Sequence, residues 1–225
     1  SDDVLYTWAG PEIAVATTKA YSTQLALVYL IGLYCARALE TIRAADYDAI
    51  VEELLLIPTK LEAILENRED IQYFASLYFN HPSIFFIGRN IDYAVGLEGS
   101  LKLKEISYIH AEGCPAAEMK HGTIALIDQE MPTIVIATNG SVYEKTISNI
   151  QEIKARGGKV IVVVTEGDCI VAEMADYCIW IPKTAECLTP LLSSIPLQLF
   201  AYYIAVNKGR NVDQPRNLAK SVTVE

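Results

Sequence analysis

The sequence has little of what metal, redox or nucleotide chemistry requires. Its five cysteines include no pair at two-residue spacing, so neither a zinc knuckle nor a dithiol redox pair is predicted. No three-glycine dinucleotide fingerprint and no phosphate-cradling lysine loop is present, so we expect neither a metal nor a cofactor. The odd cysteine count favours a reducing, cytoplasmic setting. The cysteines are Cys35, Cys114, Cys169, Cys178 and Cys187.

Positive charge and long apolar runs are also scarce. The chain has 18 Lys and Arg against 28 Asp and Glu, and a net charge of −10 predicts binding to neither nucleic acid nor an anionic membrane. Local charges would have to hold any anionic ligand. The apolar run at 25–39 covers about fifteen residues, fewer than the roughly 18–20 that span a bilayer, so it predicts a core helix. The opening Ser1-Asp2-Asp3 resembles no export leader, and secretion is not expected.

The chain is instead rich in apolar residues that can form a core. Hydrophobic residues make up 52% of its 225 residues, enough for one full domain with part of a second. From residue 83 onward, short apolar strands alternate with helical segments, which is typical of a parallel sheet with crossover helices. We therefore predict an α/β fold, a three-layer sandwich in which helices flank a parallel sheet. The predicted strands are 84–88, 133–138, 159–164 and 177–181, and the predicted helices are 91–110, 141–156 and 189–208.

The first 80 residues follow a different pattern. A short strand is predicted at 4–7, then a long helix that runs from Lys19 to about Arg43. Residues 46–80 form a second helical stretch, which Pro58 is expected to break or kink. Because one strand and one helix cannot bury both of their faces, the opening segment indicates the tail of another domain. Residues 210–225 are polar and unsuited to regular structure.

Three charged residues in the predicted helix 91–110 share one face. Glu98, Lys102 and Glu105 are spaced by four and then three residues, and the same face carries the apolar Ile91 and Val95. One interpretation is a surface ladder of ion pairs, each contributing about 0.2–0.5 kcal/mol. The other is a cluster that serves a ligand, because burying unpaired charge is costly and ligands bind at the carboxyl ends of parallel strands. The spacing alone leaves both open.

Two further residues have side chains suited to sugar chemistry. Histidine titrates near neutrality and can move a proton to or from a sugar oxygen, which makes His121 a candidate. Lys220 has an amine that can form an imine with a carbonyl. Each has a simpler interpretation, since His121 alone is consistent with a structural loop residue and Lys220 alone with a solvated tail residue.

Taken together and in order, these clusters resemble one family. The stretches are GPEIAVATTKA at 10–20, LEGSLKLKEISYIHAE at 97–112, EMKHG at 118–122 and DQPRNLAKSVTVE at 213–225. They resemble the glutamine–fructose-6-phosphate transaminases, also called glucosamine-6-phosphate synthases, over nearly the whole chain. The resemblance implies a sugar-isomerase (SIS) fold. It divides the chain into the end of a first SIS subdomain at 1–45, a second subdomain at 46–209 and a catalytic carboxy-terminal tail at 210–225.

The resemblance also implies roles for individual residues. Lys220 matches the lysine that forms an imine with the open-chain ketose, and Glu105 matches the glutamate that moves a proton between C1 and C2. Lys102 matches a lysine that supports this transfer. His121 matches a histidine that reaches the site from the neighbouring subunit and assists ring opening, which implies a homodimer. The residues expected at or near the sugar are Val15, Thr17, Glu98, Arg216 and Ala219.

The implied reaction converts fructose 6-phosphate and ammonia into glucosamine 6-phosphate. In the family, a glutaminase domain with a cysteine nucleophile releases the ammonia, and a serine- and threonine-rich loop holds the substrate phosphate. Neither occurs in this chain, so we expect the chain alone to be incomplete as an enzyme. Ala117 and Thr123 stand where the family usually has glycine and proline, beside the His121 segment.

Other functions remain as alternatives. A sugar-phosphate sensor could use the same fold to bind without catalysis, and a purely structural dimerisation piece needs no site at all. A related amino-sugar isomerase or deglycase is the nearest enzymatic alternative. The tail separates these hypotheses, because a sensor has no need of an imine-forming Lys220 behind Arg216.

Overall fold

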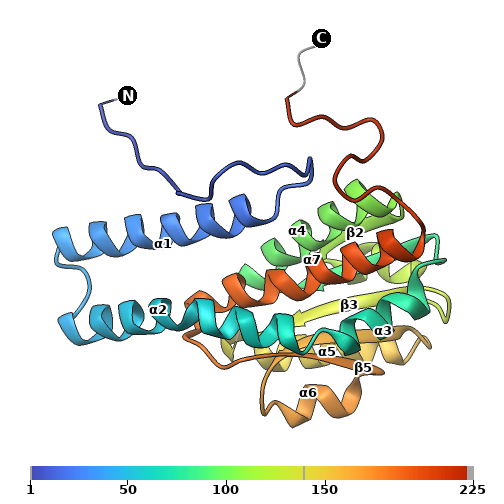
Figure 1. Ribbon diagram of the computed structural model, residues 1–225. Coiled ribbons are helices and arrows are strands. Elements are labelled where there is room, and N and C mark those ends of the chain that lie inside the picture. Colours follow the sequence, from blue (N-terminus) through green and yellow to red (C-terminus); the bar gives the residue numbers. More distant parts are fainter. Residues whose placement is uncertain (1, 139, 222–225) are drawn as a thin grey trace.

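The computed structural model describes residues 2–138 and 140–221. Its centre is a parallel five-stranded sheet with the strand order β2-β1-β3-β4-β5 (Figure 1). The predicted α/β fold is therefore confirmed, and all four predicted strands are present within one or two residues of their expected ends. The strands are β1 Ser83–Gly88, β2 His110–Pro115, β3 Pro132–Ala137, β4 Lys159–Thr165 and β5 Tyr177–Ile181.

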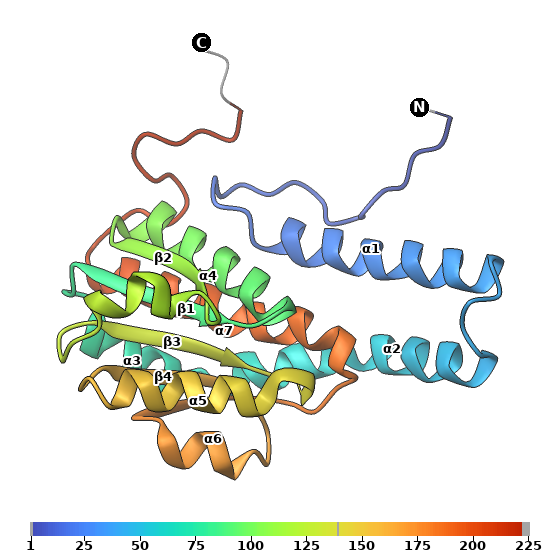
Figure 2. The same cartoon turned by 180° about the vertical axis from the view of Figure 1, so that it is seen from behind.

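Alternating side chains of each strand point to two separate cores. Ile84 and Phe86 of β1 lie in the core beneath one helical layer, whereas Phe85 and Ile87 lie in the core beneath the other. Figures 1 and 2 show these two layers on opposite sides of the sheet. The first layer contains α2 Ala44–Glu66, α3 Glu69–Tyr78, α4 Ile91–Ser107 and α7 Thr189–Asn207; the second contains α5 Tyr143–Lys154 and α6 Cys169–Met174.

Helix α7 lies at the centre of the first layer. By length and composition alone, the segment Glu186–Asn207 could cross a membrane. However, 67% of its apolar window is buried against the sheet and the neighbouring helices, as expected of a core helix. The run at 25–39 lies mostly in α1, Lys19–Ala38, which is less buried: Leu33 is its one buried residue.

Helix α1 lies apart from the sheet, and several of its apolar side chains face solvent. Val28 is 61% exposed and Tyr34 is 74% exposed. Both views show α1 joined to the start of α2 by a short loop, with the segment that precedes α1 leading to the N-terminus (Figures 1 and 2). The predicted strand at 4–7 was wrong. These residues have no regular structure because no described strand lies beside them to share hydrogen bonds.

Two helix predictions also need correction. Pro58 does not break the second helical stretch, because α2 runs through it and is buried on both sides of it, at Ile57 and Ile64. The break falls instead at Asn67 and Arg68, before α3. Helix α1 ends at Ala38, earlier than expected.

The predicted helix 91–110 ends three residues early. Tyr108 takes a left-handed backbone conformation (φ 63°), which terminates α4 after Ser107. The chain then enters β2, an edge strand that pairs with β1 from Ser83↔His110 to Gly88↔Pro115. This strand was not predicted. Its close approach to α4 requires a glycine, since a Cβ on Gly113 would lie 2.8 Å from the Leu97 side chain.

Candidate functional site

Helix α4 follows β1 and packs tightly against both the sheet and α7. A Cβ on Gly99 would lie 2.6 Å from the Leu197 side chain and 3.0 Å from Phe86, so only glycine permits this approach. The tight packing fixes the rotation of α4 about its axis. It thereby determines which side chains of the helix are buried, including those of the charged cluster.

Glu98, Lys102 and Glu105 form one ion cluster on α4. The Lys102 side chain is only 4% exposed. Its Nζ lies 2.5 Å from Glu105 Oε2 and 3.6 Å from Glu98 Oε1. A surface ladder would leave the lysine in water, so that interpretation does not fit the structure. The cluster is a buried ammonium group between two carboxylates.

The charges of this cluster do not cancel. Burial raises the pKa of the Glu98 carboxyl, and the Glu105 charge raises it further, although Lys102 opposes the shift. Glu98 also acts on α1, because burial and then the Glu98 charge raise the pKa of Tyr21. Glu105, held by its short contact with Lys102 and 21% exposed, is the more accessible carboxylate. A fixed, partly exposed carboxylate can accept and return a proton.

The segment before α1, which we call the strap (residues 10–18), is held by its own side chains. Glu12 Oε1 accepts hydrogen bonds from the Thr18 backbone N–H at 2.9 Å and from the Thr18 hydroxyl at 3.0 Å. The Lys19 amine donates to the Pro11 carbonyl at 2.7 Å. These contacts close the strap into a compact turn over the start of α1.

The tail (residues 210–221) runs beside the strap in both views (Figures 1 and 2). The Val15 N–H donates to the Asp213 carbonyl at 2.8 Å. The Lys220 amine donates to the Ala14 carbonyl at 2.9 Å and to the Val15 carbonyl at 3.4 Å. The structure therefore brings two predicted site residues, Val15 and Lys220, into direct contact across almost the whole sequence.

Tyr108 joins the tail to the end of α4. Its hydroxyl accepts a hydrogen bond from the Arg216 backbone N–H at 2.8 Å, and the Arg216 guanidinium lies 4.3 Å from its ring centre. Arg210 lies 5.3 Å from the same ring. An open pocket of about 480 Å³ lies between α4 and the tail, and both Glu105 and Arg216 line it. The predicted base and the predicted tail thus border one cavity.

His121 lies away from these contacts. It ends the short helix η1, Met119–His121, and its side chain is 76% exposed. Its Nε2 lies 3.9 Å from Glu118 Oε2 in the same turn. Within the described residues it forms no hydrogen bond or ion pair with α4 or with the tail.

The remaining two predicted site residues lie within these segments, Thr17 in the strap and Ala219 in the tail. Thr17 is half-buried and Ala219 is exposed. Sequence reasoning assigned no role to Glu12 or Tyr108, although both lie within the stretches that carried the family resemblance. Their contacts reach segments far away in the sequence, so side-chain spacing gave no signal for them.

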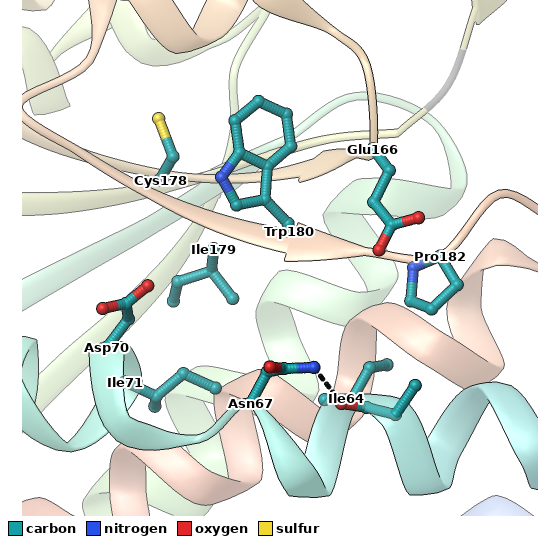
Figure 3. A pocket seen from close by; sticks show the side chains of 10 residues that line it. Ile64, Asn67, Asp70, Ile71, Glu166, Cys178, Ile179, Trp180 and Pro182 are labelled. Atoms are coloured by element: carbon teal, nitrogen blue, oxygen red, sulfur yellow. Dashed lines mark hydrogen bonds between the residues drawn. The ribbon is translucent and has the colours of Figure 1, made fainter.

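A second pocket lies at the opposite edge of the sheet (Figure 3). Its volume is about 320 Å³, and Ile179 of β5 points towards Ile71 and Asn67 at the α2–α3 junction, whereas the Trp180 ring extends from the other side of the strand. The Asn67 side chain donates to the Ala63 carbonyl at 2.9 Å. None of the predicted site residues lines this pocket. In the described residues, no group of three or more His, Cys, Asp or Glu is arranged to hold a metal.

Comparison with known proteins agrees with this architecture. The model of the SIS domain family matches residues 77–208, and the chain belongs to this family. Over its length it is similar to two glutamine–fructose-6-phosphate aminotransferases (isomerizing), at 54% identity over 225 residues in Caldanaerobacter subterraneus and 50% over 224 residues in Thermus thermophilus. The predicted family resemblance is therefore confirmed. The chain spans 37% of the length of these relatives.

Solved structures show the same likeness. The C-terminal domain of glucosamine-fructose-6-phosphate aminotransferase from Francisella tularensis superposes with a TM-score of 0.87 at 37% identity, covering 92% of this chain and 58% of that one. A tagatose-6-phosphate ketose/aldose isomerase described as putative, from Clostridium novyi, gives a TM-score of 0.81 at 19% identity and supports the fold alone. The SIS match ends at residue 208, so the strap and the tail lie outside it.

Proposed function

We propose that this chain carries the isomerase chemistry of a glutamine–fructose-6-phosphate aminotransferase, converting fructose 6-phosphate and ammonia into glucosamine 6-phosphate. The observation that carries the proposal is the contact of the Lys220 amine with the strap, on a tail that also borders the pocket of Glu105. These contacts distinguish Lys220 from a freely solvated tail lysine. The similarity to the named aminotransferases points to the same activity.

The reaction needs an amine and a base. In the proposed route, the Lys220 nitrogen attacks the C2 carbonyl of the open-chain ketose, and water leaves as the protonated imine forms. Ammonia then attacks C2 and the Lys220 amine leaves, so that C2 carries an imine of ammonia. This imine acidifies the proton on C1, which Glu105 removes and delivers to C2, giving the 2-amino aldose. Lys102 holds the Glu105 carboxylate in one orientation through their 2.5 Å contact. Glu98, Val15, Thr17, Arg216 and Ala219 are the proposed sugar contacts.

The working unit is proposed to be a homodimer. His121 is largely exposed and lies away from the tail of its own chain, which suits a residue that acts in a partner's site. There it would donate the proton that opens the sugar ring. A glutaminase domain in the complete polypeptide is the proposed source of ammonia.

We propose that the chain contains parts of three structural units. Residues 1–45 would be the end of a first SIS subdomain, 46–209 the second subdomain and 210–225 the catalytic tail. The exposed apolar side chains of α1, such as Val28 and Tyr34, support the first assignment because such a face is normally covered. A cytoplasmic location is proposed on the same family grounds, and the five unpaired cysteines favour it.

Reductive trapping tests the proposal directly. The complete polypeptide is incubated with fructose 6-phosphate and borohydride, and the tail peptide is analysed by mass spectrometry. We expect a substrate-dependent mass gain on Lys220. Lys220→Arg is the matched control, because it keeps the positive charge and cannot form the imine. An unmodified Lys220 in an enzyme that still turns over would refute the imine role.

The alternative function is a sensor that binds sugar phosphates without catalysis. A sensor would bind fructose 6-phosphate yet exchange no solvent deuterium into C1 or C2. Deuterium exchange observed by NMR separates the two functions, since the isomerase requires Glu105 to move that proton.

A further inference from the structure

Glu12 is a buried acid for which the proposed mechanism has no use. Its side chain is only 8% exposed, although the strap around it lies at the surface. One carboxylate oxygen is fully occupied by the two hydrogen bonds from Thr18. The carboxylate is therefore held in one orientation, with its second oxygen directed away from Thr18.

The second oxygen of Glu12 is buried and has no hydrogen-bond donor within the described residues. A buried carboxylate oxygen without a partner is unfavourable and calls for an explanation. The nearby cation is the Lys220 amine, whose Nζ lies 3.6 Å from this oxygen. A small displacement of the amine would turn this ion pair into a hydrogen bond.

The charge state of Glu12 suits such a contact. Burial alone raises the pKa of its carboxyl, but the Thr18 hydrogen bonds, the Lys220 charge and the Ala20 backbone N–H together outweigh burial and lower it. Glu12 is therefore ionised at neutral pH. It presents a fixed negative charge to the amine.

The amine itself has few other restraints. Lys220 is 47% exposed and lies near the end of the tail, on backbone without regular structure. An ammonium group has three N–H donors, and the Ala14 and Val15 carbonyls accept from it. Both acceptors are neutral, which leaves Glu12 as the charged group in contact with the amine among the described residues.

We infer that Glu12 is a positioning residue that holds the Lys220 amine at the strap for attack on the sugar carbonyl. This inference rests on the proposed function, because it assigns no purpose to Glu12 unless Lys220 is the nucleophile. The amine must lose a proton to solvent, which reaches it at 47% exposure, before it attacks the carbonyl, and the protonated imine that forms carries a positive charge again. Glu12 then faces a cation both before and after the carbon–nitrogen bond forms.

A single-turnover experiment with Glu12→Gln tests the inference. Glutamine keeps an oxygen for Thr18 and removes the charge that faces Lys220. We expect the rate of borohydride-trapped adduct formation on Lys220 to fall by about ten- to a hundredfold, as for a misplaced reacting group. The final amount of adduct should stay the same. A purely structural role would instead reduce the amount of adduct, because some molecules would lack a formed site.

Three further variants sharpen this test. Glu12→Asp keeps the charge but is one methylene shorter, so we expect it to recover part of the rate. Thr18→Val loses one of the two bonds that orient Glu12, and we expect a smaller decrease in the same direction. Glu62→Gln removes an exposed carboxylate of α2 and should leave the rate unchanged.

The outcomes separate the inference from the proposed function. A wild-type rate in Glu12→Gln, with the adduct still on Lys220, would overturn the role of Glu12 and leave the imine intact. No adduct on Lys220 in the wild type would overturn the proposed function first. If Glu12→Gln fails to fold, a wild-type rate in both Glu12→Asp and Thr18→Val would overturn the inference.

Discussion

The charged cluster of α4 and the contact between strap and tail are built in opposite ways. Glu98, Lys102 and Glu105 lie on one helix, and the central lysine is 4% exposed. Lys220, by contrast, is 47% exposed and contacts Ala14 and Val15, which lie more than 200 positions earlier in the chain. One half of the candidate site is part of the core, whereas the other depends on a few polar contacts between irregular segments.

This difference makes the α4 cluster the rigid half of the candidate site and the strap–tail contact the adjustable half. The cluster forms whenever α4 packs on the sheet, so its proton-transfer geometry has the stability of the core. The strap and the tail are held to each other by a few hydrogen bonds, so this contact can open without unfolding the sheet, against whose core Ala16 and Val212 pack. A nucleophile that must reach a substrate and later release it is better placed on the second kind of structure.

Removing the amine should have the largest effect. Lys220→Ala in the complete polypeptide is expected to abolish glucosamine 6-phosphate formation while glutamine hydrolysis remains detectable. The thermal midpoint should fall only slightly, because the lysine is 47% exposed and, in the part of the chain that the structure describes, forms a single ion pair, with Glu12. These three expectations are checked on one preparation by measuring product formation, ammonia release and thermal melting. A variant that still forms product would contradict the assignment.

Changing the base should come next. Glu105→Gln is expected to lower the C1–C2 proton exchange by about a hundred- to ten-thousandfold, as for loss of a general base. Trapping of the imine on Lys220 should persist, because the amine is held by other residues. Measuring deuterium exchange and borohydride trapping on the same sample tests whether exchange is lost while imine formation is retained. Wild-type exchange would remove Glu105 as the base.

A smaller effect is expected at Tyr108, which joins the end of α4 to the tail. Tyr108→Phe removes the hydroxyl that accepts from the Arg216 N–H and keeps the ring beneath the guanidinium. The lost hydrogen bond is worth about 0.5–1.5 kcal/mol, so the tail should open several-fold more often. Trypsin cleavage after Arg216, followed by mass spectrometry, would measure this. Tyr202→Phe, at an exposed tyrosine of α7, is the control and should cleave at the wild-type rate.

The smallest effect concerns the pH dependence of the cluster. Because the folded-state pKa of Glu98 is raised, the folded chain holds this proton where the unfolded chain has released it. Stability is therefore lost as pH rises from about 4.5 through the raised folded pKa. Glu98→Gln should become more stable relative to wild type as pH rises towards neutrality. Urea unfolding at several pH values measures this, and a difference that does not vary with pH would contradict it.

The regular parts of the fold were predictable because their signal is local. Strand β4 and its neighbours are short β-branched runs that are buried on both faces of a parallel sheet, which is how such strands read in a sequence. The spacing of Glu98, Lys102 and Glu105 likewise fixed their common helix face. Whether that face was buried could not be decided, because it depends on Gly99 meeting Leu197 from a distant helix.

The parts that escaped prediction depend on distant partners. Strand β2 lacks a β-branched run and exists because β1 offers it an edge. Residues 4–7 (Val-Leu-Tyr-Thr) are mostly of types that favour strands, but no described strand lies beside them. Glu12 and Tyr108 each act on the tail from a segment far away in sequence. The family resemblance identified the stretches that contain them but not these contacts.

The carbonyl oxygens that receive the Lys220 amine belong to the main chain at Ala14 and Val15. Exchanging either side chain leaves both acceptors in place, so this part of the anchor tolerates evolutionary drift in a way that Glu12 cannot. Its vulnerability lies in the backbone path itself. Val15→Pro would delete the N–H that bonds to Asp213 and reroute the strap, and it would thereby displace the amine without altering one polar side chain.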